Sequence, residues 1–233
     1  YRESTVSPAG LGLFRPTSWD NWRLDYGPDG DADYQDHYGI ATDLPVIGDF
    51  NNDGTADRAV FRAGGWIFDH GIDGSVNIRD YYGIPGDIPL AGDFDDDSIS
   101  DRAVFRGSAW DNWIFDYDMD GTAESRDRFG TAGDLPLTGD FNNDNISDRA
   151  VFRGSAWDNW IFDYGMDGTV DTRNRYGMTG DTPFAGDFNN DGISDRVVFR
   201  NGEWITDLNM DGSVDYRIIY GQAGDILMVW NDG

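Results

Sequence analysis

Short runs of apolar and alternating residues, separated by polar turns, follow one another along this chain. In residues 40–83 the run LPVIGDF (44–50) is largely apolar, DRAVFR (57–62) alternates, and WIFD (66–69) and VNIRDYYG (76–83) follow. Runs of this length bounded by Gly, Asn and Asp are typical of β-strands, and no stretch has a convincing helical period. Each such unit is therefore predicted to form four short strands.

The same unit recurs at a nearly constant spacing. The segment GDFNNDGTADRAVFR starts at Gly48, and near copies start at Gly92, Gly139 and Gly186, at successive spacings of 44, 47 and 47 residues. Four strands in each such interval is the size of one β-propeller blade. Five strands end in Phe-Arg and five in Tyr-Gly or Phe-Gly, which predicts five blades. These endings lie at Arg15, Arg62, Arg106, Arg153 and Arg200, and at Gly39, Gly83, Gly130, Gly177 and Gly221.

The two ends of the chain are predicted to share one blade. The first unit lacks its leading strand, whereas GDILMVWNDG at the end of the chain matches GDIPLAGDF of that strand. We expect residues 224–230 to supply the missing innermost strand, which leaves no open seam in the ring. The predicted fold is an all-β five-bladed β-propeller with four antiparallel strands per blade. Its parts, within one domain, are an N-terminal extension (1–8), the shared closing blade (9–39 plus 224–233) and four further blades (40–83, 84–130, 131–177 and 178–221).

An oxygen-rich loop follows the first strand of four units. Counted from its first aspartate, the loop has Asp or Asn at positions 1, 3 and 5 and Asp at position 9. Six to eight oxygens are what Ca²⁺ requires, and the backbone carbonyl at position 7 can add one. The candidate calcium ligands are Asp49, Asn51, Asp53, Thr55 and Asp57; Asp93, Asp95, Asp97, Ile99 and Asp101; Asp140, Asn142, Asp144, Ile146 and Asp148; and Asp187, Asn189, Asp191, Ile193 and Asp195.

The alternative is that these side chains only cap turns by bonding their own backbone. Four loops that each point several carboxylates inward repel themselves without a cation, so we favour metal binding. An EF-hand is excluded, because position 12 of the first copy is Val60 and a strand follows instead of a helix. Ser98 and Asn145 replace the loop glycine, and Ser98 makes the loop from Asp93 the least regular in geometry although it is the richest in charge.

A second set of acidic loops lies between the third and fourth strands, and the alternation of strands places it on the same face as the first. Two copies keep every ligand position: Asp116, Asp118, Asp120 and Glu124, and Asp207, Asn209, Asp211 and Asp215. In the other three units Gly27, Gly71 and Gly165 stand at position 3. For all five copies the alternative is an ordinary Asp-Gly hairpin turn.

The charge of the chain changes the choice of partners. With 44 acidic residues, 17 arginines and no lysine, its net charge is -27, which disfavours nucleic acid and anionic membranes. A salt-adapted acidic surface is the alternative to metal binding, although only three of the acids are glutamate. There is no cysteine and no apolar run long enough for a membrane span. A chain that begins at Tyr1 without methionine is expected to be processed or trimmed, and weak calcium sites favour an extracellular or cell-surface location.

The segment GDIPLAGDFDDDSISDRAVFRGSAWDNWIFD, residues 86–116, resembles the FG-GAP and VCBS-type repeats of β-propellers, which are related to the integrin α-subunit head. In this family an acidic D-x-[DN]-x-[DN]-G-x-x-D loop joins the first two strands of a blade and binds calcium. The resemblance extends over almost the whole chain. It implies an extracellular propeller with calcium on one face, used in adhesion or sugar recognition and usually without catalysis.

The face opposite the acidic loops carries the variation between units. The turn RAGGW (62–66) of one unit is replaced by RGSAWDNW in two others (106–113 and 153–160). Tryptophan beside Asp and Asn suits a sugar site, because the indole covers the pyranose face and the polar groups bond its hydroxyls. The candidate ligand-binding residues are Trp19, Trp110, Trp157, Asp111, Asn112, Asp158 and Asn159. The alternative, slightly favoured, is that these rings pack against the neighbouring blade.

Two further repeated positions are predicted to be structural. A tryptophan begins a strand in every unit, and these five, Trp22, Trp66, Trp113, Trp160 and Trp204, are expected in the core. Aspartates precede the innermost strands near the five Phe-Arg endings, and we expect the two to form ion pairs that clasp adjacent blades rather than to line a pore mouth. These aspartates are Asp43, Asp87, Asp134, Asp181 and Asp225.

Three classes of function follow from these patterns. The favoured hypothesis is a non-catalytic, calcium-binding extracellular recognition or adhesion module whose partner is a glycan or an extracellular protein. The second is a glycoside hydrolase or lyase, which needs two carboxylates in different environments. Most acids here recur in every unit, Glu203 has no evident partner, and the histidines His37 and His70 belong to no motif. The third is a structural bead that self-associates through calcium.

Overall fold

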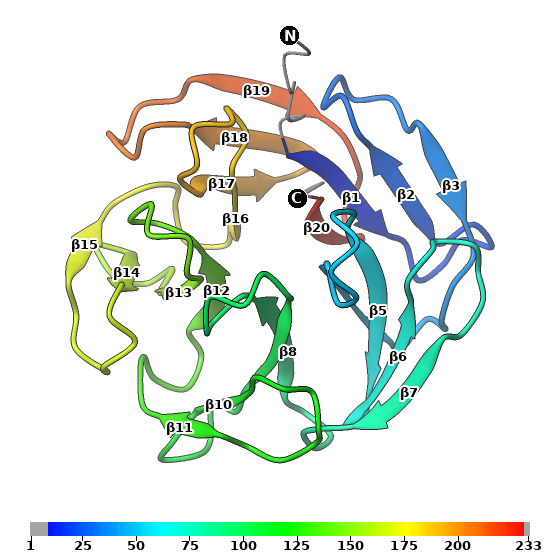
Figure 1. Cartoon of the computed structure of the whole chain (residues 1–233). Helices are drawn as coiled ribbons and strands as arrows, with labels where there is room; N and C mark the ends of the chain where they lie inside the picture. Colours follow the sequence, from blue (N-terminus) through cyan, green and yellow to red (C-terminus); the bar gives the residue numbers. More distant parts are fainter. Residues whose placement is uncertain (1–8, 231–233) are drawn as a thin grey trace, which may run out of the picture.

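The computed structural model describes residues 9–230, which form five four-stranded antiparallel sheets arranged in a ring (Figure 1). This arrangement confirms the predicted five-bladed propeller. Blade one contains β20 (Ile226–Trp230), β1 (Gly10–Phe14), β2 (Trp22–Asp25) and β3 (Tyr34–Asp36); blade two contains β4 (Leu44–Gly48), β5 (Asp57–Arg62), β6 (Gly65–Asp69) and β7 (Ile78–Tyr81). Blade three contains β8 (Ile88–Gly92), β9 (Asp101–Phe105), β10 (Trp113–Asp116) and β11 (Ser125–Asp127). Blade four contains β12 (Leu135–Gly139), β13 (Asp148–Phe152), β14 (Trp160–Asp163) and β15 (Thr172–Asn174), and blade five β16 (Thr182–Gly186), β17 (Asp195–Arg200), β18 (Glu203–Asp207) and β19 (Tyr216–Ile219).

The ring closes as predicted. β20 pairs antiparallel with β1, in a register that places Gly10 opposite Trp230 and Phe14 opposite Ile226. The innermost strand of blade one therefore comes from the opposite end of the described chain. The predicted N-terminal extension (1–8) and the last three residues (231–233) of the closing blade lie outside the described residues. Within residues 9–230, no helix has the length and apolar character needed to cross a membrane.

The hydrophobic core lies between successive sheets, and the repeated tryptophans occupy it as predicted. All five are fully buried. Each indole N–H donates to a carbonyl just beyond the outermost strand of its own blade, as Trp66 does to Tyr82 at 2.9 Å. One apolar cluster joins Val46 and Phe68 of blade two to Val104 and Ile114 of blade three. The ring is thus held by apolar packing between blades as well as by β20.

The predicted ion pairs between repeated Asp and Arg form, but they do not join neighbouring blades. Arg62 donates to Asp43 with nitrogen–oxygen distances of 2.6 and 2.7 Å, and both residues belong to blade two. The same pair forms inside each other blade, including Arg15 with Asp225 in the closing one. Each aspartate also accepts a backbone N–H from the incoming connection, as Asp43 does from Ile40. These pairs therefore fix the start of a blade instead of clasping two blades.

The contact between blades comes from a different arginine, the second residue of the DRAVFR strand. Arg102 is fully buried and donates to Asp116 of its own blade at 2.6 Å and to Asp80 of the preceding blade at 2.6 Å. Its guanidinium also lies 5.1 Å from the ring centre of Tyr82, again in the preceding blade. Arg58 and Arg149 make the equivalent bridges to the preceding blade. A buried guanidinium stacked on an aromatic ring and paired with two carboxylates favours one blade-to-blade geometry.

The closing junction is built differently. At the position of Arg102, blade one has Leu11, and at the position of Asp80, blade five has Ile218. Leu11 and Ile218 pack in one apolar cluster with Trp204 and Leu13. The junction formed through β20 therefore relies on apolar contact where three of the others use a buried ion pair.

Candidate functional site: acidic loops on one face and a tryptophan rim on the other

The two sets of acidic loops meet on one face of the ring. We call the loops after the innermost strands the first loops (49–57, 93–101, 140–148 and 187–195) and those between the third and fourth strands the second loops (25–33, 69–77, 116–124, 163–171 and 207–215). His70 of a second loop lies 3.0 Å from Asp57 of a first loop. Within blade five, Asn189 of a first loop donates to the carbonyl of Leu208 of a second loop at 3.2 Å. The prediction that both sets share a face is confirmed.

Each first loop is wound around its leading aspartate. The carboxylate of Asp49 accepts the backbone N–H groups of Asp53 at 3.2 Å and Gly54 at 2.9 Å, and the other three copies repeat this. The sixth residue takes a left-handed conformation in every copy, with φ of 81° at Gly54 and 69° at Ser98. Ser98 therefore keeps the turn in spite of its side chain, so the loop from Asp93 is as regular as the others.

The last aspartate of each first loop is buried, and in two blades one of its oxygens has no partner among residues 9–230. Asp101 accepts the backbone N–H of Phe94 through Oδ2 at 2.8 Å, while its buried Oδ1 makes no hydrogen bond to any described residue. Asp195 is in the same situation, and within the described part of the chain only Phe188 donates to it. Burial away from water raises the pKa of Asp101 and of Asp195 to about 8, and that of Asp148 to about 7. A buried carboxylate with one free oxygen is a strong ligand for a cation.

Blade three brings the acids closest together. Asp93, Asp95 and Asp101 each place a carboxylate oxygen within 4.8 Å of the others. This spacing suits a hard cation that accepts carboxylate oxygens. Asp97, the predicted ligand at position 5, is not in this group, because its Oδ1 accepts the backbone N–H of Ile99 at 2.8 Å. Position 5 is held in the same way in the other first loops, by Thr55, Ile146 and Ile193.

The first loops of blades two, four and five have asparagine at position 3, and there the amide nitrogen faces the acids. Asn142 donates to Asp144 at 3.0 Å and to Asp148 at 3.3 Å, and Asn51 donates to Asp57 at 3.2 Å. Rotation of the amide by 180° would present its oxygen to a cation instead. In blade two His70 also contacts Asp57. Burial raises the pKa of Asp57 to about 6, and the contact with His70 opposes this rise. The four loops thus differ in how much rearrangement a metal ion requires.

The second loops compete with a buried arginine. Asp116, Asp118, Asp120 and Glu124 have oxygens within 4.8 Å of one another, as expected for a complete ligand set. Asp116, however, is already paired with Arg102, and Asp207 is paired with Arg196 at 2.7 Å in the other complete loop. The guanidinium therefore already supplies positive charge to the first of the candidate ligands in each complete loop. The remaining predicted ligands, Asn209, Asp211 and Asp215, bond the backbone of their own loop.

The opposite face carries exposed tryptophans, so the favoured alternative that they pack against a neighbouring blade is wrong. Trp19, Trp110 and Trp157 are 80%, 75% and 75% exposed. Each ring is instead covered on one side by a residue of its own blade. Arg128 lies 4.2 Å from the ring centre of Trp110, and Arg175 lies 3.9 Å from that of Trp157. His37 stacks on Trp19 at 5.0 Å.

The asparagines of the WDNW pattern are structural and do not face a ligand. Asn112 and Asn159 are each 2% exposed. Asn159 bonds both the N–H and the carbonyl of Tyr176, and Asn112 accepts the N–H of Phe129. They close the long turn onto the outermost strand, which is why the longer turn keeps them. Asp111 and Asp158 are exposed beside the tryptophans and remain available.

The two blades without the extra tryptophan expose another large side chain nearby. Tyr81 and Ile219 occupy the positions of Arg128 and Arg175 in their blades, and both are 79% exposed. We call the five exposed side chains the tryptophan rim: Trp19, Tyr81, Trp110, Trp157 and Ile219. Tyr81 and Ile219 were not predicted from the sequence. Both directly precede the repeated Tyr-Gly ending, at a position that holds His37, Arg128 or Arg175 in the blades with the extra tryptophan.

No protein-family model matches the chain, and no curated protein matches it either. Among solved structures it is similar to an Agrocybe aegerita lectin described as specifically recognising non-reducing terminal N-acetylglucosamine, at 13% identity and a TM-score of 0.49, over 80% of this chain and 56% of that one. A Bacteroides caccae protein of unknown function has 12% identity, a TM-score of 0.49 and coverage of 91% and 73%. The V. cholerae biofilm matrix protein Bap1 has 18% identity and a TM-score of 0.36, with coverage of 80% and 34%. The chain spans little more than half the length of the lectin, and these similarities carry no functional conclusion.

Proposed function

We propose that this protein is a non-catalytic, calcium-binding recognition module that works outside the cell, built from repeats of the FG-GAP/VCBS type. The observation that carries the proposal is the buried and unpartnered Oδ1 of Asp101, which recurs at Asp195. A carboxylate oxygen removed from water without a partner costs free energy, and buried carboxylates in proteins are normally paired or bound to metal. A divalent cation removes that cost at both positions.

The first loop of blade three is the site that fits calcium best. Asp93, Asp95 and Asp101 supply converging carboxylates, and the carbonyl of Ile99 and water complete the shell in the proposal. Bound there, the ion would offset part of the negative charge of the loop. The loop is also connected to its neighbours, since the carbonyl of Asp93 accepts the backbone N–H of Ser147 in blade four at 2.6 Å. Calcium at this position would therefore stiffen the junction between blades three and four.

The metal proposal is tested by calorimetric titration of calcium into protein that has been treated with a chelator. We expect binding in the range of extracellular calcium modules, with dissociation constants of about 10⁻⁴–10⁻³ M. Asp101→Asn removes one charge from the cluster and should abolish the tightest site. Asp96→Asn is the matched control, because it removes the same charge from an exposed position of the same loop. Absence of calcium heat in the unaltered protein contradicts the proposal.

The tryptophan rim supports a second part of the proposal, in which this face binds a glycan or an extracellular protein. Three indoles that are at least 75% exposed do not contribute to the core, and each presents one flat apolar face that a sugar ring can cover. Aromatic rings stack on the apolar faces of sugars, with Asp111 and Asp158 as hydroxyl acceptors. We favour glycan over protein because the three indoles are separated around the ring instead of forming one patch.

A glycan array with labelled protein tests this part. The double variant Trp110→Ala/Trp157→Ala should lose binding to whichever glycans the unaltered protein retains. Met178→Ala, which truncates another exposed apolar side chain, is the control. Glycan binding that survives the double variant contradicts the assignment of the rim. Product release from the bound glycans would favour the glycoside hydrolase or lyase, and calcium-dependent multimers in size-exclusion chromatography would favour the structural bead.

A further inference from the structure

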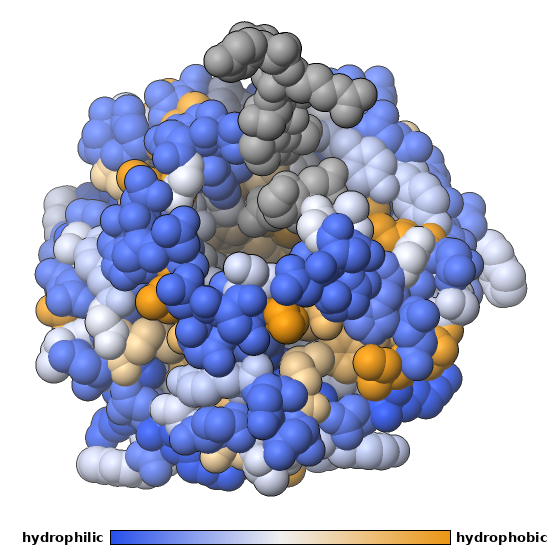
Figure 2. Space-filling model, viewed as in Figure 1, coloured by the Kyte–Doolittle hydropathy of each residue, from blue (hydrophilic) through white to orange (hydrophobic). Residues whose placement is uncertain are grey.

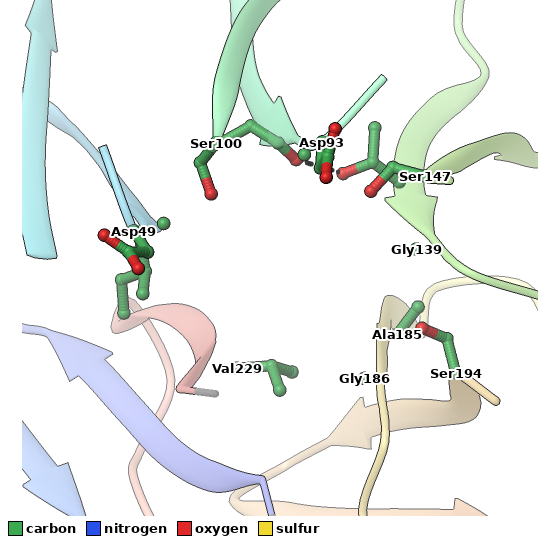
Figure 3. Close-up of a pocket in the computed structure, with 14 residues that line it drawn as sticks. Asp49, Asp93, Ser100, Gly139, Ser147, Ala185, Gly186, Ser194 and Val229 are labelled. Atoms are coloured by element: carbon green, nitrogen blue, oxygen red, sulfur yellow. Dashed lines mark hydrogen bonds between the residues drawn. The ribbon is translucent and has the colours of Figure 1, made fainter. Parts of the chain in front are cut away.

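The structure contains a cavity at the centre of the ring, bordered on the acidic face by Asp49 and Asp93 of the first loops and separate from the tryptophan rim. Its volume is about 220 Å³, and it lies where the innermost strands of the blades converge. On the face seen in Figure 2, hydrophilic residues surround a central hollow. Figure 3 shows that residues of several blades line the cavity, with side chains of Ser100, Ser147 and Ser194 around it.

Three serine hydroxyls in this cavity have no hydrogen-bond partner among residues 9–230. The backbone N–H groups of Ser100, Ser147 and Ser194 are used, since they donate to the carbonyls of Asp49, Asp93 and Asp140 in the preceding blades at 2.6 to 2.7 Å. Their hydroxyls make no bond to any described residue. Ser194 as a whole residue is only 8% exposed, and its hydroxyl faces the cavity without a partner among the described residues. A hydroxyl placed in this way can bond a ligand in the cavity.

Glycine makes room for these hydroxyls. A Cβ built on Gly48 would lie 2.7 Å from the Oγ of Ser100, and one on Gly139 would lie 2.6 Å from the Oγ of Ser194. Each serine therefore fills a notch in the neighbouring innermost strand, and no larger residue fits at those glycines. This explains the repeated glycine that the sequence places at the end of the innermost strand.

The cavity has a polar level and an apolar level. The residue before each of these glycines carries a short apolar or hydroxyl side chain, and these form the inner wall: Ile47, Ala91, Thr138 and Ala185, with Val229 from β20. Thr138 is satisfied by donating to the carbonyl of Ala91 at 2.7 Å. The residue after the glycine is the leading aspartate of a first loop, and Asp49 and Asp93 line the cavity. Towards the acidic face the wall thus passes from methyl groups to hydroxyls and then to carboxylates.

We propose that this axial cavity binds a primary alkylammonium group. Among the described residues no cationic side chain lines it, whereas two carboxylates do, and the chain as a whole has a net charge of -27. An ammonium carries three N–H donors and no acceptor, so hydroxyl, carboxylate and carbonyl oxygens can satisfy it completely. The negative potential of the acidic face attracts the charged ammonium group. The same potential gives a neutral polyol no such gain and repels an anion.

The position of the ammonium follows from the two levels. The apolar wall offers an ammonium group few acceptors, so the head group stops at the hydroxyls and the alkyl stem leaves between the first loops. The chain has no lysine of its own. The ammonium therefore comes from elsewhere, either a free amine or polyamine or the lysine side chain of another protein. Both sources present the same chemistry to the cavity.

The test is calorimetric titration of n-butylammonium chloride into the intact protein, with 1-butanol as the neutral analogue and sodium chloride at equal ionic strength as the charge control. We expect saturable binding of butylammonium at a single site, and no heat of binding for butanol or sodium. Equal binding of butanol, or displacement of butylammonium by an equal concentration of sodium, overturns the proposal.

Variants locate the site. Ser147→Ala/Ser194→Ala should weaken butylammonium binding at least tenfold, because two bonds to a charged group are lost. Its melting temperature should stay unchanged, since those hydroxyls bond nothing in the described protein. Ser108→Ala/Ser155→Ala, on the opposite face, is the matched control and should bind as before. Ala185→Leu fills the cavity and should abolish binding. Unchanged affinity in both the serine double variant and Ala185→Leu overturns the assignment.

Two further comparisons identify the source of the ammonium group and the effect of calcium on its binding. Putrescine and a peptide with one central lysine are compared with butylammonium, and tighter binding of either supports the shared chemistry while identifying the source. All titrations are repeated in 10 mM calcium and in chelator. Because Asp93 belongs to both proposed sites, calcium binding is measured without amine and amine binding is measured in chelator, so that failure of one proposal leaves the other result readable.

Discussion

The two faces of the ring use repeated residues in opposite ways. On the acidic face, the leading and last aspartates of each first loop bond backbone N–H groups, and the last one is buried. On the other face, Trp110 and Trp157 are three-quarters exposed and touch little beyond one arginine each. Changes on the acidic face should therefore alter stability, whereas changes on the tryptophan rim should alter binding and leave stability almost intact.

Removal of calcium should have the largest effect. At a calcium concentration 100 times the dissociation constant, each occupied site stabilises the folded state by about 2.7 kcal/mol. For a chain of this size, each kcal/mol raises the melting temperature by about 2–4 °C. Two occupied first loops would thus give a shift of about 10–20 °C between calcium and chelator, measured by calorimetry. Equal melting temperatures in the two buffers would mean that calcium does not stabilise the acidic face, and the expected difference in stability between the two faces would be absent.

Two arginines with similar ring contacts compare the faces directly. Arg102 lies over Tyr82 between blades and is fully buried, whereas Arg128 lies over Trp110 on the rim. Arg102→Ala leaves Asp116 buried and unpaired, so we expect a loss of about 3–5 kcal/mol in the free energy of unfolding. Arg128→Ala should cost about 0.5–1 kcal/mol. Denaturant titration of both variants measures the difference, and similar losses would contradict the assigned burial.

The pH dependence of the calcium-free protein should reveal the buried acids. Burial raises the pKa of Asp101 and Asp195 to about 8, above the value of about 3.9 for an unfolded aspartate. A raised pKa means that the folded state binds protons more tightly, so this stability is complete below about pH 4 and is lost as the pH rises through about 8.

In chelator, the melting temperature should therefore fall between pH 5 and pH 8.5. Calcium replaces the protons and should remove the fall. Asp101→Asn/Asp195→Asn should reduce the slope in chelator, because the amides do not titrate, and Asp148, whose pKa burial raises to about 7, should retain part of it. A slope that this double variant leaves unchanged would assign the pH dependence to other groups.

The smallest effect is expected on the rim. Trp110→Ala/Trp157→Ala removes two exposed rings and one cation–π contact for each, so the free energy of unfolding should fall by about 1–2 kcal/mol at most. The corresponding core change, Trp113→Ala, should cost about 3–5 kcal/mol, since that ring is fully buried. Thermal unfolding of the two variants decides whether the rim is independent of the fold.

Several features of the protein could be predicted because they depend on local spacing. The strand DRAVFR at 57–62 was predicted at its observed bounds, since its apolar alternation and flanking turns are contained in a few residues. The closing strand β20 followed from the match between the two chain ends. The left-handed turn at position 6 of the first loops followed from Gly54, and its persistence at Ser98 shows that the bonds to the leading aspartate impose it.

Other features were decided by contacts between units that are distant in sequence. The sequence around Arg102 predicts only that it lies in a strand. It does not indicate that Asp80 of another blade pairs with this arginine. Asn112 and Trp110 lie two residues apart in the sequence. Asn112 is buried and accepts the backbone N–H of Phe129, whereas Trp110 faces solvent. Residue order determined the repeats, the ring and the acidic loops, because these arise from short-range pattern. Burial determined which repeated side chain packs, pairs or remains free, because burial exists only once the five sheets have met.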